Sequence, residues 1–240
     1  MMFSKENRTL WDDTKLGFIF GFFGGYNNAA AVIILLYEIA PMSANWGGMA
    51  KAIGHIQIDK VFTFIPLILC FISGAFIGSK WAKRSNPVNI VIAESLILMS
   101  VAFFAKDNTR LAITLGALAM GLQNGMSTLV SHHAVRTSHL TSTVTDIGIG
   151  LARRDYKGAL VKSSKAFTYM WGAVVGTVKA GLIGNMVFAL GGLYLMILMI
   201  ARIMVANCES CKRRGALVEE WFTQVKSAPA VKAKAKPASH

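Results

Sequence analysis

The chain reads LGFIFGFFGGYNNAAAVIILL over residues 16–36. This stretch holds no charged residue, and two adjacent amides, Asn27 and Asn28, stand in its middle. About 20 predominantly apolar residues are needed for a helix to cross the hydrocarbon core of a bilayer. The stretch therefore predicts a membrane-spanning helix, and Glu38 and Pro41 follow its end.

The composition agrees with a bilayer as the solvent. Of the 240 residues, 54% are hydrophobic and 15% are charged, whereas about 25% charged residues are usual in soluble domains. The formal net charge of +13 could indicate nucleic acid as a partner. However, the Lys and Arg residues lie between and beyond the apolar runs rather than on one amphipathic face, so they indicate membrane topology and no nucleic-acid surface.

Several further apolar runs have the length of a span, and they cover residues 61–79, 87–105, 111–130, 166–183 and 186–205. The segments 42–60 and 131–165 are only partly apolar, and they predict interfacial or half-inserted helices. Residues 1–15 form a short N-terminal segment, and the basic tail 207–240 is predicted to be largely disordered. The predicted fold is an all-α integral membrane protein with about six transmembrane helices.

The Lys and Arg residues are divided unevenly between the two faces of the membrane. If the chain crosses six times, 20 of the 25 lie on the face that holds both termini. Cytoplasmic loops carry an excess of Lys and Arg. The sequence therefore predicts that both termini lie in the cytoplasm.

The two halves of the apolar region resemble each other. A shift of 98 positions aligns SGAFIG at 73–78 with WGAVVG at 171–176, and a shift of 96 aligns GYNNA at 25–29 with GLQNG at 121–125. Three spans in each half would turn the second copy upside down, as in many secondary transporters. We therefore predict two inverted three-helix repeats, 16–105 and 106–206; the alternative is that glycine-rich helices resemble one another because small residues favour helix packing.

Four amides lie inside the predicted spans, at matching positions of the two halves: Asn27, Asn28, Gln123 and Asn124. Polar groups that face lipid are costly, so such residues usually face the interior and are candidates for function. In an inverted repeat they could meet near the midplane and bind a small polar solute or a cation. The alternative is that they form hydrogen bonds between helices.

Two other polar features are candidates for substrate binding. Glu94 is the acidic residue deep in a predicted span, where burial favours the protonated carboxyl unless a cation pairs with it, as in a proton-coupled carrier. The alternative is a neutral Glu94 that bonds to a neighbouring helix. Thr141 and Thr143 belong to a hydroxyl-rich segment that could bind an anion at a helix N-terminus or cap that helix.

The chain resembles a known family at GYNNA (25–29), MSAN (42–45), AMGLQNG (119–125) and RTSHLTSTVTDIG (136–148). These motifs are similar to those of the YoaK-like family, multipass bacterial membrane proteins known as a domain of unknown function. The resemblance covers about residues 16–206 and implies a six-span protein of the bacterial inner membrane, without a substrate, cofactor or reaction. The family pattern usually has Asp where this chain has Asn28, so a role that needs a carboxylate there is not expected.

Residues for metal binding or catalysis form no recognisable pattern. His132, His133 and His139 have no Cys or paired carboxylates at ligand spacing, and Cys208 and Cys211 supply half of a zinc site. Nucleophile elbows and phosphate-binding loops are absent from the sequence. We therefore expect neither an enzyme nor a metal or organic cofactor.

Two hypotheses for function follow. The first is a small-solute permease or carrier, which could form a homo-oligomer, with a site between the first and fourth spans around Asn28 and Asn124. The second is a non-transporting scaffold or accessory subunit whose basic tail contacts anionic lipid or a protein partner.

Overall fold

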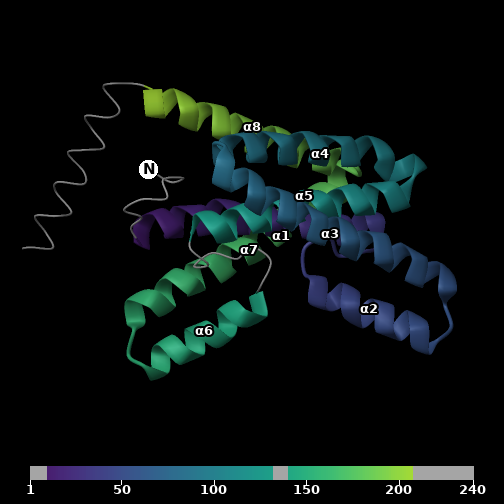
Figure 1. The fold of residues 1–240 in the computed structure, drawn as a ribbon, viewed down its shortest axis with the longest axis horizontal. Helices are drawn as coiled ribbons and strands as arrows, with labels where there is room; N and C mark the ends of the chain where they lie inside the picture. Colours follow the sequence, from purple (N-terminus) through teal and green to yellow (C-terminus); the bar gives the residue numbers. More distant parts are fainter. Residues whose placement is uncertain (1–9, 132–139, 208–240) are drawn as a thin grey trace, which may run out of the picture. The chain divides into compact units, whose positions relative to one another are not determined.

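The computed structural model describes residues 10–131 and 140–207, and these residues form α-helices with short connections and no strand (Figure 1). The helices are α1 (Leu10–Leu35), α2 (Met42–Gly54), α3 (Ile58–Arg84), α4 (Pro87–Asp107), α5 (Thr109–Val130), α6 (Leu140–Ala152), α7 (Tyr156–Ile183) and α8 (Met186–Asn207). A boundary between two units falls within α8, between Ile197 and Leu198. The contacts described below all lie within the first unit.

All six predicted apolar runs are helical, and both intermediate segments contain a short helix. Two helices begin before the predicted spans: α1 begins at Leu10 rather than at position 16, and α7 begins at Tyr156 rather than at position 166. The early start of α7 reflects a helix cap, because the Asp155 side chain accepts a hydrogen bond from the backbone N–H of Gly158 at 3.0 Å. The polar residues that follow are therefore part of a long helix.

Four of the helices are long and apolar enough to cross a membrane: α1 from Thr14, α3, α4 and α7. The apolar part of α8 described as Met186–Ala201 is shorter. Large hydrophobic side chains such as Phe62, Phe76 and Phe167 are exposed on α3 and α7, as expected for surfaces that face lipid. The described residues thus form an all-helical fold in which four helices have the length and composition of membrane spans, and the count of six spans remains a prediction.

The two short helices pack against the first halves of long ones (Figure 1). The Phe64 ring of α3 lies against Gly48 of α2, and Ala159 of α7 lies against Gly150 of α6. Each short helix has 13 residues, whereas α3 has 27 and α7 has 28. Because each pair is an antiparallel hairpin, the short helix begins beside the middle of its neighbour.

The turns of these two hairpins have the same geometry. Ile56 and Arg154, which are 98 residues apart, have positive φ angles of 55° and 58°. The residue after each of them donates a backbone hydrogen bond to the short helix. The N–H of Gln57 donates to the carbonyl oxygen of Ala52 at 2.8 Å, and the N–H of Asp155 donates to that of Gly150 at 2.9 Å. The backbone therefore repeats the same turn at the spacing that the sequence alignment gave.

Glycines allow backbone contact between α1 and α7. A Cβ atom at Gly172 would overlap the carbonyl oxygen of Phe22, and one at Gly176 would overlap that of Tyr26. These contacts advance in the same direction along both helices, so α1 and α7 are parallel. Such close approach is typical of small-residue interfaces in membranes.

A second interface of the same kind joins α3 and α5. A Cβ atom at Gly74 would overlap the carbonyl oxygen of Leu118, and one at Gly78 would overlap that of Leu122. On the α5 side, Gly121 lies equally close to the carbonyl oxygen of Phe71. These two helices are therefore also parallel, and they are held by backbone contact from both sides.

We expect Gly172→Val to destabilise the protein strongly, because the new side chain would overlap the Phe22 carbonyl group and separate α1 from α7. Overpacking of this kind costs about 1–3 kcal/mol or more. Gly181→Val is the matched control on the same helix, since nothing lies within 4 Å of a Cβ atom there. Thermal unfolding in detergent measures both, and equal melting temperatures would contradict the proposed role of the interface.

Candidate functional site

Asn27 of α1 is fully buried and only half satisfied. Its Nδ2 donates to the carbonyl oxygen of Phe23 at 3.0 Å. Its Oδ1 has no hydrogen-bond partner among the residues that the structure describes. The oxygen points towards α8, where a Cβ atom at Gly191 would lie 3.0 Å from it. Asn27 therefore presents a free acceptor to the interior.

Gln123 of α5 is buried in the same state. Its Nε2 donates to the carbonyl oxygen of Phe20 on α1 at 2.8 Å, so the side chain links the two helices. Its Oε1 has no partner within the described part of the chain. Ile39, whose N–H binds Asn28, lies against Gly116. Since α5 runs from Gly116 to Gln123 while α1 runs from Phe20 to Asn28, the two helices are antiparallel.

Glu94 of α4 is the third buried side chain with free acceptors. It is 0% exposed, as are Asn27 and Gln123, and neither carboxyl oxygen has a partner among the described residues. Because α4 and α5 form a tight hairpin around Asn108, Glu94 and Gln123 lie at nearly equal distances from the turn and hence at a similar depth.

Helix α8 contacts both Asn27 and Ser95, the residue that follows Glu94. Gly191 lies against Asn27, and a Cβ atom on the next residue, Gly192, would lie 2.6 Å from the carbonyl oxygen of Ser95. The Ser95 hydroxyl itself donates to Val91 at 2.8 Å. We name Asn27, Glu94 and Gln123 the central acceptor cluster because all three are fully buried and have oxygens without a partner among the described residues. Gln123 bonds to Phe20, seven residues before Asn27, so Gln123 and Asn27 are offset by about 10 Å along α1. The side-chain amides of Asn27 and Gln123 donate to backbone carbonyls, so the atoms of the three residues without a partner are oxygens.

Asn28 has a different environment from Asn27. Its Oδ1 accepts from the backbone N–H groups of Ile39 at 3.0 Å and Ala40 at 3.1 Å, and its side chain also bonds to that of Tyr169. The chain reverses between these partners at Leu36, which has a φ of 61°. Asn28 therefore stabilises the chain reversal after α1. Its side-chain oxygen, which was expected to bind solute, accepts these backbone hydrogen bonds instead.

Asn124 is buried on α5, and the Ser127 hydroxyl donates to its backbone carbonyl at 3.2 Å. Its neighbour Gln123 bonds to Phe20, and Asn28 lies about 12 Å further along the axis of α1. The antiparallel course of α1 and α5 thus separates Asn28 from Asn124 in depth. A shared site around these two residues remains a prediction that the geometry does not favour.

Thr141 and Thr143 lie in the first turn of α6, apart from the central acceptor cluster. The carbonyl oxygen of Thr141 accepts from the Thr145 hydroxyl at 3.1 Å. The buried Thr143 hydroxyl accepts from Lys165 of α7 at 3.5 Å. Asp146 forms an ion pair with Lys162 at 3.4 Å, but both side chains are well exposed, so it contributes little stability. These bonds join α6 to α7.

The sequence did not single out two residues that complete the interior. The Tyr26 hydroxyl donates to the Val187 carbonyl oxygen at 3.1 Å, and the Asn185 amide donates to that of Ala102 at 2.6 Å. Tyr26 belongs to the GYNNA motif, which was the available signal. The candidate metal residues His132, His133, His139, Cys208 and Cys211 lie outside the described residues.

Comparison with known proteins gives one match. A family model described as "Protein of unknown function (DUF1275)" matches residues 16–206. No curated protein and no solved structure matches the chain. The match agrees with the family resemblance found in the sequence, over the same residues.

We expect Asn28→Ala to destabilise the protein, because the N–H groups of Ile39 and Ala40 would lose their acceptor. Each unsatisfied buried group costs about 1–3 kcal/mol. Asn28→Asp keeps an acceptor and should retain most of the stability, and Asn89→Ala removes an exposed amide as a control. Thermal unfolding tests the ranking, which would be refuted if Asn28→Ala melted like the wild type.

Proposed function

The chain belongs to the DUF1275 family of proteins of unknown function, and from that premise we propose that it is a small-solute carrier of the bacterial inner membrane. Its substrate is a small cation or a small solute rich in hydrogen-bond donors. The central acceptor cluster holds this substrate in the interior of the helix bundle.

Four buried oxygen atoms carry this proposal: Asn27 Oδ1, Gln123 Oε1 and both carboxyl oxygens of Glu94. An unsatisfied buried polar group costs about 1–3 kcal/mol, and polar residues inside a membrane protein commonly mark the path of a substrate or ion. Apolar side chains at these positions would be cheaper if the interior served packing alone. A ligand that donates hydrogen bonds or carries positive charge offsets this cost.

The predicted inverted repeat agrees with the same function. Helices α6 and α7 begin 98 residues after α2 and α3, and the positive φ angles of Ile56 and Arg154 have the same spacing. The long first-half helices α1 and α3 pack parallel to the second-half helices α7 and α5, respectively. The equivalent helices α1 and α5 are antiparallel. Inverted repeats with sites at their interface are common in secondary transporters.

The half-length helices fit this design. In transporters of this kind, irregular backbone at membrane depth lines a protected interior. Here the chain reversal between α1 and α2 is buried at Ile39 and Ala40 and is satisfied by Asn28. Each half thus contributes a helix that reaches only part of the way along its neighbour.

The chemistry of the cluster differs between the halves. Asn27 and Gln123 occupy equivalent positions, whereas the equivalent of Glu94 is Gly192. In the predicted repeat only the first half therefore has a carboxyl group at this position, and the second half has a glycine. This favours a single binding site over two equivalent ones.

Ligand-dependent stability tests the carrier. We expect K⁺, Na⁺, ammonium or methylammonium to raise the melting temperature of the purified protein with increasing concentration, since a ligand at 100 times its Kd contributes about 2.7 kcal/mol. Glu94→Met should melt higher without ligand, because an unpaired carboxyl is removed, and should lose the response. Gln123→Leu should weaken the response, and Asn89→Leu, an exposed amide on α4, should keep it.

Two results would contradict the carrier. A response retained in both Glu94→Met and Gln123→Leu would mean that the ligand binds elsewhere. If none of the four cations affects the wild type although Glu94→Met melts higher, a non-transporting scaffold or accessory subunit becomes the better explanation. Uptake of the responding cation into proteoliposomes then shows whether the protein transports the cation or only binds it.

Topology is tested separately with single cysteines, after replacement of Cys70, Cys208 and Cys211. A cysteine at Ser85, between α3 and α4, should react with a membrane-impermeant maleimide in inside-out vesicles only. A cysteine at Asp107, the last residue of α4, should react in spheroplasts only. The opposite labelling would reverse the proposed orientation.

A further inference from the structure

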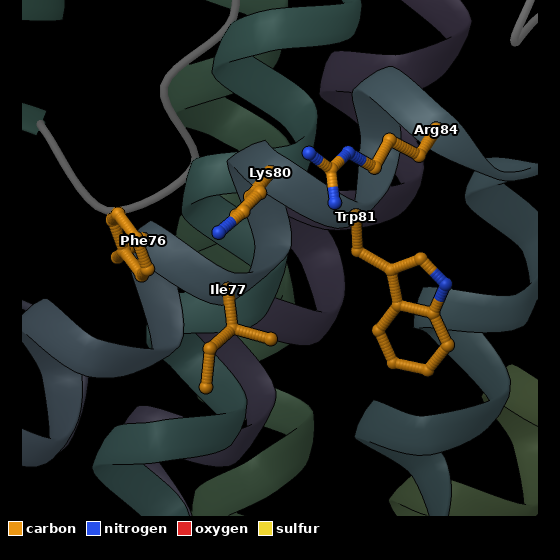
Figure 2. Close-up of a pocket in the computed structure, with 5 residues that line it drawn as sticks. All are labelled: Phe76, Ile77, Lys80, Trp81 and Arg84. Carbon is orange, nitrogen blue, oxygen red and sulfur yellow. The ribbon is translucent and has the colours of Figure 1, made fainter.

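A pocket of about 390 Å³ lies on the outer surface of the last turns of α3. Figure 2 shows the residues that line it: Phe76, Ile77, Lys80, Trp81 and Arg84. Phe76, Lys80 and Arg84 are each four residues apart, so they lie along one face of the helix. Ile77 and Trp81 form the neighbouring row. The pocket therefore combines two cations with apolar and aromatic walls.

The two cations are available for an anion. Lys80 Nζ lies 5.5 Å from the centroid of the Phe76 ring, and in Figure 2 the Arg84 guanidinium extends above Trp81 towards Lys80. Within the described part of the chain, neither cation has an ion pair. A guanidinium group binds phosphate oxygens with two parallel hydrogen bonds, and an ammonium group adds a point charge.

We propose that this pocket binds the phosphate group of an anionic phospholipid from the surrounding bilayer. The apolar walls continue along α3 through the exposed side chains of Leu69, Ile72 and Phe76, which offer a surface for acyl chains. A free phosphate ion would gain nothing from that surface. Basic pockets at the cytoplasmic ends of membrane helices are suited to anionic headgroups.

The cations are not required by the packing of the helix. At the positions of α7 that are 98 residues later, Val174, Val178 and Leu182 replace Phe76, Lys80 and Arg84, and all three are exposed. The backbone also gives the anion no help, because α3 ends here and a helix C-terminus carries partial negative charge. Binding therefore depends on the two side chains.

Native mass spectrometry of the full-length protein, titrated with dioleoylphosphatidylglycerol, tests the site. We expect at least about tenfold weaker binding in Lys80→Gln/Arg84→Gln than in the wild type, since two charge-assisted contacts are lost. The matched control is Arg153→Gln/Lys157→Gln, which removes the same charge from exposed positions at the α6–α7 turn. This control should bind like the wild type.

Further measurements distinguish lipid binding from ion binding, and specific binding from general charge attraction. Dioleoylphosphatidylcholine should bind weakly to all variants, and inorganic phosphate should not compete with the anionic lipid. Equal loss in both double variants would mean general charge attraction and would overturn the proposal. If inorganic phosphate competed with the lipid, the ligand of the pocket would be a free anion and the lipid proposal would be overturned. The result is independent of the carrier, because the central acceptor cluster is untouched.

Discussion

Backbone contact at glycine is the constraint on which the rest of this structure depends. Lipid is as apolar as leucine, so helices in a bilayer associate through close packing rather than through a hydrophobic driving force. Gly172 and Gly176 bring α7 onto the carbonyl groups of α1, and Gly74 and Gly78 do the same for α3 and α5. These contacts set the rotation of the helices about their axes. They thereby determine which side chains of α1 and α5 point inward, including Asn27 and Gln123.

Three consecutive residues of α1 show how that rotation gives neighbouring polar side chains different roles. Successive residues of a helix point about 100° apart, so Tyr26, Asn27 and Asn28 face different neighbours. Tyr26 bonds to α8, Asn28 holds the chain reversal that precedes α2, and Asn27 keeps a free oxygen next to Gly191. A motif that looks uniform in sequence thus contains two structural residues and one candidate ligand.

The helical order of the chain could be predicted from sequence, because hydrophobic length and charge placement are local properties. The start of α7 could not, since the Asp155 cap makes polar residues helical that a hydrophobicity pattern assigns to a loop. The roles of the amides were also beyond sequence. Asn27 and Asn28 have the same chemistry, and only the tertiary positions of Gly191, Ile39 and Ala40 distinguish them. For the same reason Asn28 and Asn124 match in an alignment yet lie at different depths.

Matching positions of the two predicted repeats differ in charge. The positive φ angles at Ile56 and Arg154 recur 98 residues apart, as do the interface glycines Gly74 and Gly172. The ionisable residues do not recur: Glu94 has Gly192 as its counterpart, while Lys80 and Arg84 have Val178 and Leu182. Glu94 is buried and its carboxyl oxygens have no partner among the described residues, whereas a Cβ atom at the matching Gly192 would lie 2.6 Å from the carbonyl oxygen of Ser95. Close packing of α8 against α4 therefore explains the glycine, and the unpaired carboxyl is the feature that packing does not explain.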